Sequence, residues 1–224
     1  MTASDAKRQV AEAIRMLEQA GIMDFNGHAS VRLPGGGLLI NSGNSVRCAL
    51  GPDDVVAIDG DGRPIEGSVA PPMEFHIHAR IYERRPDVHA VIHAHPKWST
   101  YFTMAGVAIE PVFPQGALLG ELPLLPEIAS INTHAMGVAL AETLGAGRAA
   151  LLQSHGTVVV GTDMVEAFAL CVYLEENAQR QYMARALGPV RVLSAEEAER
   201  SRKHLWKRGL FQKAWNHYQA KLEN

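Results

Sequence analysis

The sequence predicts a single α/β domain with a central, mainly antiparallel or mixed β-sheet flanked by helices. Two observations point to this class. Helix-like and strand-like segments alternate along the chain, and several short strands are joined by tight turns, which are typical of antiparallel pairing. The 224 residues are enough for one sizeable hydrophobic core. We therefore expect one domain over residues 1–224, with residues 209–224 as a C-terminal helical tail.

The first half of the chain is expected to begin with a helix and continue as hairpins. Apolar residues recur at helical spacing over 5–20, and Gly21 follows as a C-cap. Strands are predicted on both sides of the "PGGG" turn at 34–37, and again at 55–58 before the turn "DGDG". A helix over about 72–84 is bounded by prolines, and "VHAVIHA" at 88–94 follows as a strand.

The second half is expected to alternate in the same way. Residues 97–106 predict a helix, "GVAIEPV" at 106–112 a short strand, and 115–135 a loop rich in Gly, Pro and Leu. The remaining predicted elements are a helix over 134–144 capped by Gly145, strands at 149–153 and 157–160, a helix from "TDMVE" to about Leu187, a helix opening with the capping box of Ser194 and Glu197, and a last helix over 209–221.

Composition excludes several classes of function. The net charge is −3, and no basic stretch favours a nucleic-acid or membrane surface. No apolar run has the length of a membrane span, and the N-terminus lacks the pattern of a signal peptide. The two cysteines are too few for a disulfide framework and indicate reduced thiols, so we expect a cytoplasmic protein.

The stretch "DVHAVIHAHP" at 87–96 predicts a metal site. His93 and His95 point to the same face of a strand because their spacing is two. An isolated pair of this kind is also common on ordinary strands. Here Pro96 ends the strand just beyond the pair, and His155 lies at another strand end in "LLQSHGTVVVG". Three imidazoles leave one coordination position open, which is the catalytic pattern.

Glu74 is the candidate acid/base partner of these histidines. It lies in the first turn of the helix entered through Pro71 and Pro72. A carboxylate there is also favoured by the helix dipole alone, so a purely structural role stays open.

Three segments resemble the class II aldolase/adducin family: "GHASVRLPGGGLLINSG", "MEFHIHARIYERRPDVHAVIHAHP" and "LLQSHGTVVVG". The resemblance covers about residues 8–210. It implies an α/β/α fold, a homotetramer with active sites between subunits, and one divalent metal ion per subunit held by His93, His95 and His155. It also implies that Glu74 is the acid/base. Three imidazoles suit zinc, manganese, iron or cobalt alike.

This sequence differs from the sugar-phosphate aldolases of the family at phosphate-binding positions, and the differences narrow the range of possible substrates. Those enzymes bind phosphate with an asparagine where this chain has His28, and with two serines where it has Pro72 and Met73. Only Ser42 and Gly43 keep part of the second phosphate loop. Pro72 has no N–H and Met73 no hydroxyl, so we expect a substrate without phosphate.

The segment "NGHASVRLP" resembles instead the family's decarboxylase branch, which implies that His28 and Arg32 lie near the pocket. Some aldolases of the family have a tyrosine before "GL", where this chain has Arg208. An arginine suits a planar carboxylate. A structural salt bridge for Arg32 and a solvated charge for Arg208 remain alternatives.

Other side chains have weaker assignments. His78 is a candidate for a contact with the residues that hold the metal. His89 is expected at the surface or at an interface, and His134 as a helix cap or in the pocket wall. Trp98, Tyr101 and Phe102 are expected in the core or in subunit packing. The tail aromatics, which could cover a neighbouring subunit's site, are Trp206, Trp215 and Tyr218.

The predicted function is that of a metal-dependent carbon–carbon lyase. A cation beside a carbonyl stabilises the enolate left by C–C cleavage, and Glu74 moves the proton. The favoured reaction is decarboxylation of a small-molecule carboxylate, namely a hydroxylated aromatic acid of the dihydroxyphthalate type or an oxo acid. A class II aldolase acting on a small hydroxy-carbonyl compound is the alternative, and a non-catalytic adducin-like scaffold is the third.

Overall fold

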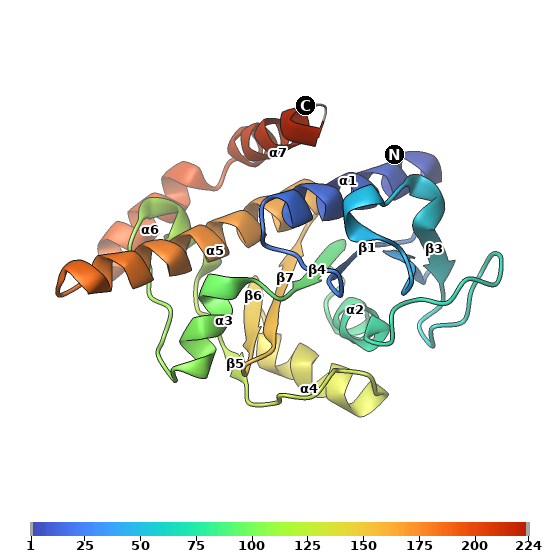
Figure 1. The fold of residues 1–224 in the computed structure, drawn as a ribbon, viewed down its shortest axis with the longest axis horizontal. Coiled ribbons are helices and arrows are strands. Elements are labelled where there is room, and N and C mark those ends of the chain that lie inside the picture. The colour runs from blue at the N-terminus through green and yellow to red at the C-terminus, as the bar shows by residue number, and fades with distance from the viewer. Residues whose placement is uncertain (1, 223–224) are drawn as a thin grey trace.

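A seven-stranded mixed sheet lies at the centre of the computed structural model, which describes residues 2–222. The strand order is β3-β2-β1-β4-β7-β6-β5, and every neighbouring pair is antiparallel except the parallel pair β5–β6 (Figure 1). The predicted fold class is confirmed. The strands are β1 His28–Arg32, β2 Leu38–Asn41, β3 Val55–Ile58, β4 Ala90–Ala94, β5 Leu124–Leu125, β6 Ala149–Leu152 and β7 Gly156–Gly161.

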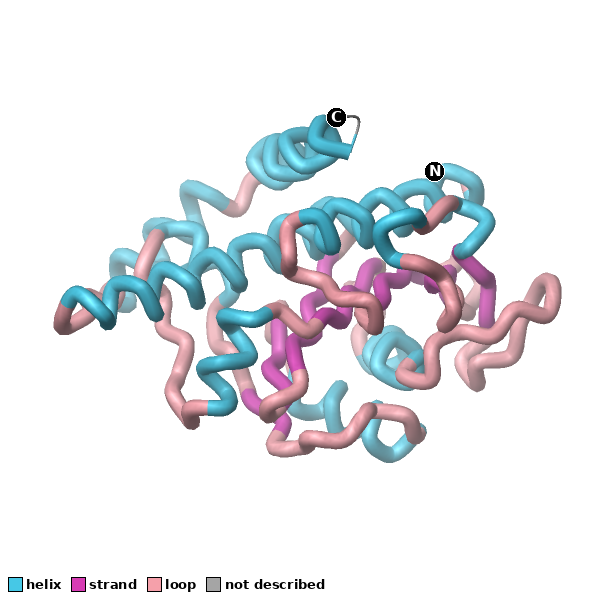
Figure 2. The backbone as a smooth tube through the Cα atoms, viewed as in Figure 1, coloured by secondary structure: helices cyan, strands magenta, loops and turns pink. Residues whose placement is uncertain are grey.

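Helices cover both faces of this sheet. Figures 1 and 2 show α1 and α5 crossing one face, with α2 and α4 on the opposite one. In the described chain, no helix is both long enough and apolar enough to cross a membrane. The α-helices are α1 Ala3–Gln19, α2 Phe75–Arg84, α3 Lys97–Met104, α4 His134–Leu144, α5 Met164–Leu187, α6 Ala195–Leu205 and α7 Arg208–Leu222; short 3-10 helices span Arg47–Ala49, Pro52–Asp54 and Pro114–Leu119.

The alternation of side chains along each strand divides the core into two layers. On β4, Ala90 and Ile92 face the layer formed with α1, α5 and α7, whereas Val91 faces the layer formed with α2 and α4. A strand that is buried on both faces is normally apolar throughout. The one polar residue of β4, the fully buried His93, therefore marks a special site.

One predicted strand, at 106–112, is absent. Its backbone is not paired with another strand. Instead, the side chain of Asn177 on α5 accepts from Val112 N and donates to Glu110 O, and Gln181 accepts from Glu110 N and donates to Ala108 O. Two amide side chains one helical turn apart thus satisfy an extended segment that has strand-like residues but no neighbouring strand.

Two other boundaries differ from the predictions. The helix expected from Pro72 begins at Phe75, three residues later. The expected loop at 115–135 contains most of the 3-10 helix Pro114–Leu119 and the edge strand β5. The last helix forms much as expected, but Trp215 is buried against Phe168, with ring centroids 5.3 Å apart, so it packs in the core of its own chain.

Candidate metal centre and active site

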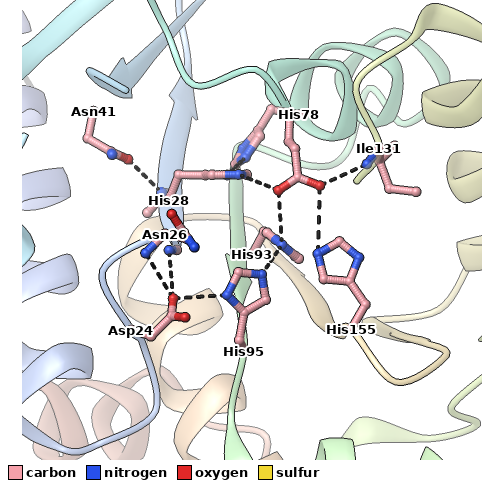
Figure 3. Close-up of polar contacts among 12 residues, drawn as sticks. Asp24, Asn26, His28, Asn41, His78, His93, His95, Ile131 and His155 are labelled. Carbon is pink, nitrogen blue, oxygen red and sulfur yellow. Dashed lines mark hydrogen bonds and ion pairs between the residues drawn. The ribbon is translucent and has the colours of Figure 1, made fainter. Parts of the chain in front are cut away.

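Four side chains converge at the ends of the central strands, and their ligand atoms all lie within 4.8 Å of one another. His93 lies near the end of β4, His95 just beyond it and His155 in the turn between β6 and β7 (Figure 3). Glu74 lies directly before α2. Because β4 and β7 are neighbours in the sheet, residues about sixty positions apart in sequence meet at one edge. The structure thus brings together the four residues predicted as metal ligands and acid/base.

The turn that carries His155 is tightly constrained. Ser154 has a φ of 53°, the left-handed region that non-glycine residues rarely adopt. The next residue, Gly156, lies so close to β4 that a Cβ atom there would be 2.3 Å from the Ala94 carbonyl oxygen and 3.0 Å from the His95 ring. The glycine is therefore required for β7 to approach the metal-site histidines, which explains the "HG" pair of the sequence.

The hydrogen bonds of His93 and His95 prepare both rings for a cation. His93 Nδ1 lies 3.0 Å from the Thr157 carbonyl oxygen, and His95 Nδ1 lies 2.9 Å from Asp24 Oδ1. Both partners accept, so each Nδ1 carries the hydrogen and each Nε2 of the neutral ring presents a lone pair. These two Nε2 atoms are 3.0 Å apart. Two facing lone pairs are unfavourable without a cation, so the donor set fits a divalent metal ion.

Glu74 is the N-cap residue of α2, yet its side chain makes no capping hydrogen bond. Oε1 accepts from Ile131 N at 2.8 Å, while Oε2 lies 3.6 Å from Nε2 of both His28 and His93. Burial alone raises the pKa of this carboxyl, but the facing rings and the Ile131 N–H outweigh it and hold the pKa well below its usual range. The carboxylate is therefore directed into the site, not toward its own helix.

His28 joins this cluster from β1. It lies directly opposite His93 in the β1–β4 ladder, and the two ring centroids are 4.9 Å apart. The ring is 1% exposed, and its Nε2 has no hydrogen-bond partner among residues 2–222. Burial lowers the pKa of His28, and the nearby Glu74 carboxylate only partly opposes this, so the ring is neutral near pH 7.

A cavity of about 690 Å³ opens over these residues. Pro71, Pro72 and Met73 form one part of its wall. Arg47 is another lining residue, although only 4% of it is exposed. Its Nε donates to Gly27 O at 2.6 Å and its Nη1 to Ser45, whereas Nη2 makes no hydrogen bond within the described chain. The other residues lining the cavity are Asn26, His28, Gly43, Asn44, Ala70, Glu74, His95, Ile128, Ser130, Ser154 and His155.

Comparison with known proteins identifies the architecture around this cavity. Residues 8–182 match the model of the class II aldolase and adducin N-terminal domain. The chain belongs to the class II aldolase and adducin family. Its relatives include enzymes of more than one type.

Two curated relatives of this family illustrate that range. The chain is 31% identical over 175 residues to the 5-methylthioribulose-1-phosphate/5-deoxyribulose-1-phosphate aldolase of Rhodospirillum rubrum, a match covering 78% of each chain. It is 26% identical over 193 residues to the 3,4-dihydroxyphthalate decarboxylase of Arthrobacter keyseri, covering 80% of this chain and 78% of the relative.

Solved structures of the family share the fold. The L-fuculose 1-phosphate aldolase of Glaciozyma antarctica superposes with a TM-score of 0.86 at 24% identity, over 98% of this chain and 89% of that one. YgbL of Escherichia coli superposes with a TM-score of 0.79 at 28% identity, over 89% and 99%. Class II aldolases use a divalent metal ion, in keeping with the His/Glu cluster of this chain.

The predicted substrate-binding residues of this family member are only partly brought together. His28 and Gly43 line the cavity; Ser42 is buried beside it but does not line it. Arg32 is held away from the cavity, because its guanidinium donates to the carbonyl oxygens of Tyr82, Val88 and Arg85 at 2.6–2.9 Å. Arg208 forms a surface ion pair with Asp163 at 2.9 Å. Within one subunit, neither arginine reaches the site.

The weaker histidine assignments also find their places. His78 contacts the site indirectly, with Nε2 2.6 Å from His28 Nδ1. His89 is exposed and outside the metal cluster, and His134 is exposed at the start of α4, where Thr133 is the cap.

Three contributors to the site were missed from the sequence: Asp24, Arg47 and the Ile131 N–H. Each comes from a segment without regular spacing relative to the ligands. The one available signal was the turn-forming "DFNG" that precedes His28.

Proposed function

We propose that this chain is a divalent-metal-dependent carboxy-lyase that acts on a hydroxylated aromatic carboxylic acid, or on an oxo carboxylic acid, without a phosphate group. Glu74 is its acid/base, His93, His95 and His155 hold the metal, and His28 and Arg47 contact the substrate. Family membership supports a metal-dependent lyase, and the decarboxylase of Arthrobacter keyseri supports the carboxy-lyase reaction.

The cavity wall is the observation that carries this proposal. A phosphate group needs several N–H and hydroxyl donors. Pro71 and Pro72 offer no N–H, Met73 offers no hydroxyl, and the Gly43 N–H already donates to Ala70 O at 3.2 Å. The free Nη2 of the buried Arg47 suits a carboxylate, which accepts charge-assisted hydrogen bonds from a guanidinium and needs fewer further N–H and hydroxyl donors than a phosphate does.

The residues divide the work of the reaction. Arg47 binds and orients a carboxylate, and Oε2 of Glu74 takes the proton of a substrate hydroxyl and returns it to the carbon that loses carbon dioxide. One further proton from solvent restores the hydroxyl, so the acid is converted into carbon dioxide and a product with hydrogen in place of the carboxylate. The cation, when bound, supplies Lewis-acid stabilisation of the negative charge left by C–C cleavage.

Carbon dioxide release tests the proposal. The purified protein, supplied separately with zinc, manganese, iron(II) and cobalt, is incubated with a panel of dihydroxybenzoic, dihydroxyphthalic and oxo acids. We expect release from at least one acid and its loss in Glu74→Gln, which keeps the shape of the side chain but not its charge. Metal content measured on the same samples shows whether the variant still binds the ion. Absence of release from every acid, with metal bound, contradicts the proposal.

An aldolase is the second candidate, because the Rhodospirillum rubrum aldolase has the higher identity of the two curated relatives described above. Its signature is release of an aldehyde from a hydroxy-carbonyl compound without carbon dioxide, which a coupled dehydrogenase assay detects. A scaffold without activity is disfavoured by the prepared donor set of His93 and His95. A protein that retains no metal after purification and reconstitution would favour the scaffold.

We also propose that the chain assembles as a homo-oligomer, a tetramer in keeping with its family resemblance, with active sites between subunits. Met73 and Ile128 line the cavity, yet they are 75% and 67% exposed, and Phe25, next to Asp24, is 79% exposed. Large apolar side chains around the mouth of a site are suited to contact with another subunit.

A further inference from the structure

Four buried polar side chains form a continuous hydrogen-bonded chain behind the metal centre. His28 Nδ1 lies 2.6 Å from His78 Nε2, His78 Nδ1 lies 2.6 Å from Ser30 Oγ, and Ser30 Oγ lies 2.8 Å from Tyr82 Oη. None of the four is more than 5% exposed. Figure 3 shows His28 and His78 beside the metal-site histidines, at the end of this chain that meets the cavity.

The members of this hydrogen-bonded series come alternately from strand β1 and helix α2. His28 and Ser30 are two apart on β1, and His78 and Tyr82 are four apart on α2. The rise over two residues of a strand is about 6.6 Å, and the rise over four residues of a helix is about 6 Å. Because the two distances match, the side chains of the two pairs interdigitate. This geometry places polar partners opposite one another within an otherwise apolar layer.

The number of polar hydrogens on the four side chains allows the hydrogen bonds of this series to run in either of two directions. Each hydroxyl and each neutral imidazole has one polar hydrogen. In the inward direction, His28 donates to His78, His78 to Ser30, and Ser30 to Tyr82, which donates to the Ser30 carbonyl oxygen at 3.0 Å. In the outward direction, Tyr82 donates to Ser30 Oγ and no longer to the Ser30 carbonyl oxygen, Ser30 donates to His78, and His78 donates to His28, which leaves the His28 hydrogen on Nε2.

Glu74 decides between the two directions. His28 Nε2 is buried without a hydrogen-bond partner in the described chain, and it faces Glu74 Oε2 at 3.6 Å. In the inward direction a lone pair would point at a carboxylate in a site of low dielectric, which is repulsive. In the outward direction an N–H points at it.

We propose that Ser30 and His78 are positioning residues that fix His28 with its hydrogen on Nε2, so that His28 donates a hydrogen bond to a substrate oxygen beside Glu74. The substrate part of this inference rests on the proposed function; the orientation of the ring does not. Tyr82 closes the inner end: burial raises the pKa of its hydroxyl, so it holds its proton and the chain orients His28 without conducting protons to solvent.

Nitrogen NMR tests the orientation directly. The full-length protein, labelled with ¹⁵N in its histidines and without added metal, gives two-bond ¹H–¹⁵N correlations that distinguish the two neutral tautomers. His28→Gln and His78→Gln assign the signals. We expect both rings in the Nε2–H form, and a His28 ring in the Nδ1–H form overturns the proposal. Tyr82→Phe adds a second check: the tautomers should stay unchanged, because Ser30 still donates to His78, and a change overturns it.

Kinetics test the positioning role. We expect Ser30→Ala to lower kcat/KM on the order of tenfold at unchanged metal content, because His78 loses its donor and His28 its fixed orientation. Ser30→Thr keeps the hydroxyl and should restore most of the activity. Wild-type kinetics in Ser30→Ala, or no rescue by Ser30→Thr, overturn the role. Failure of the proposed function is recognised separately, because the NMR result requires no turnover.

Discussion

Arg47 places a buried charge in the wall of the cavity. Its Nε and Nη1 are held by Gly27 and Ser45, so the guanidinium cannot swing away, and burial lowers its pKa without removing the charge. A fixed guanidinium with one nitrogen uncommitted suits an anion. The carboxylate of the proposed substrate would supply that anion.

We therefore expect Arg47→Met to raise KM for the carboxylate substrate roughly 10- to 100-fold, the cost of a charge-assisted hydrogen bond, with a smaller change in kcat. Steady-state kinetics measure it. Arg47→Lys is the matched control, which keeps the charge but not the planar fork and should lie between the two. An Arg47→Met protein that folds and has an unchanged KM would remove Arg47 from the substrate site.

Asp24 contacts the candidate metal cluster through His95. Its carboxylate fixes the His95 hydrogen on Nδ1 and leaves Nε2 free for the ion. We expect Asp24→Asn to weaken metal binding about 10- to 100-fold, the usual cost of losing such an outer partner, which competition with a chelator of known affinity measures. His89→Ala, at an exposed histidine, should leave metal affinity unchanged. Wild-type affinity in Asp24→Asn would show that this hydrogen bond does not tune the ligand.

The convergence of the candidate metal ligands could be predicted from sequence because local geometry determines much of it. A spacing of two on a strand aims His93 and His95 together, and a glycine beside His155 indicates a close approach. Of the residues proposed to contact the substrate, His28 was expected from the family resemblance, but Arg47 could not be predicted from spacing. Arg32 and Arg47 are both arginines near the site in sequence, but only the loop path decides that the first binds backbone carbonyl oxygens and the second lines the cavity.

At the scale of elements, an ion pair between Arg85 and Asp87 helps to hold the connection between α2 and β4. Arg85 contacts both carboxylate oxygens of Asp87 at 2.8 Å and also donates to the carbonyl oxygens of Gly145 and Gly147. The pair thus ties the end of α2 to the segment that follows α4. It lowers the pKa of Asp87 from 3.8 to about 2, mainly through the hydrogen bonds from Arg85.

Asp87→Asn should therefore cost stability in a pH-dependent way. The folded-state pKa is depressed, so the contribution is fully present above the unfolded value of 3.8 and disappears as the pH falls toward about 2. Because half of the Asp87 side chain is exposed, solvent screening limits the contribution to about 0.5–1 kcal/mol at pH 7. Urea unfolding of both proteins across this pH range measures it. A difference that persists unchanged at pH 2 would contradict the assignment.

The prediction of a strand at 106–112 was wrong because side chains, not a neighbouring strand, bind the backbone of this segment. Residues 106–112 have the composition of a strand, and only the tertiary structure shows that Asn177 and Gln181 of α5 take the place of the missing neighbour. Propensity describes what a segment tolerates, and the available partners decide what it forms. The turn-linked strands around 34–37, by contrast, were predictable because their pairing is local.

At the scale of the whole molecule, the exposed apolar rim of the cavity predicts assembly. We expect Met73→Glu to shift the protein toward smaller species, because a charge in an apolar contact is costly to bury. Light scattering coupled to gel filtration measures the mass. Leu187→Glu is the matched control, since this side chain is 93% exposed at the far end of α5, away from the cavity. Unchanged mass in Met73→Glu would place the subunit interface elsewhere.

The matching rise between the paired residues of β1 and α2 also limits where residues can be inserted into this protein. A residue inserted between His28 and Ser30 would turn one of them to the opposite face of the sheet, and one inserted between His78 and Tyr82 would rotate one of them about 100° around the helix. The loop between β3 and α2, where Glu66 and Gly67 are exposed, has no such constraint. Natural length variation among close homologues should therefore gather in that loop, while the two paired elements keep their length.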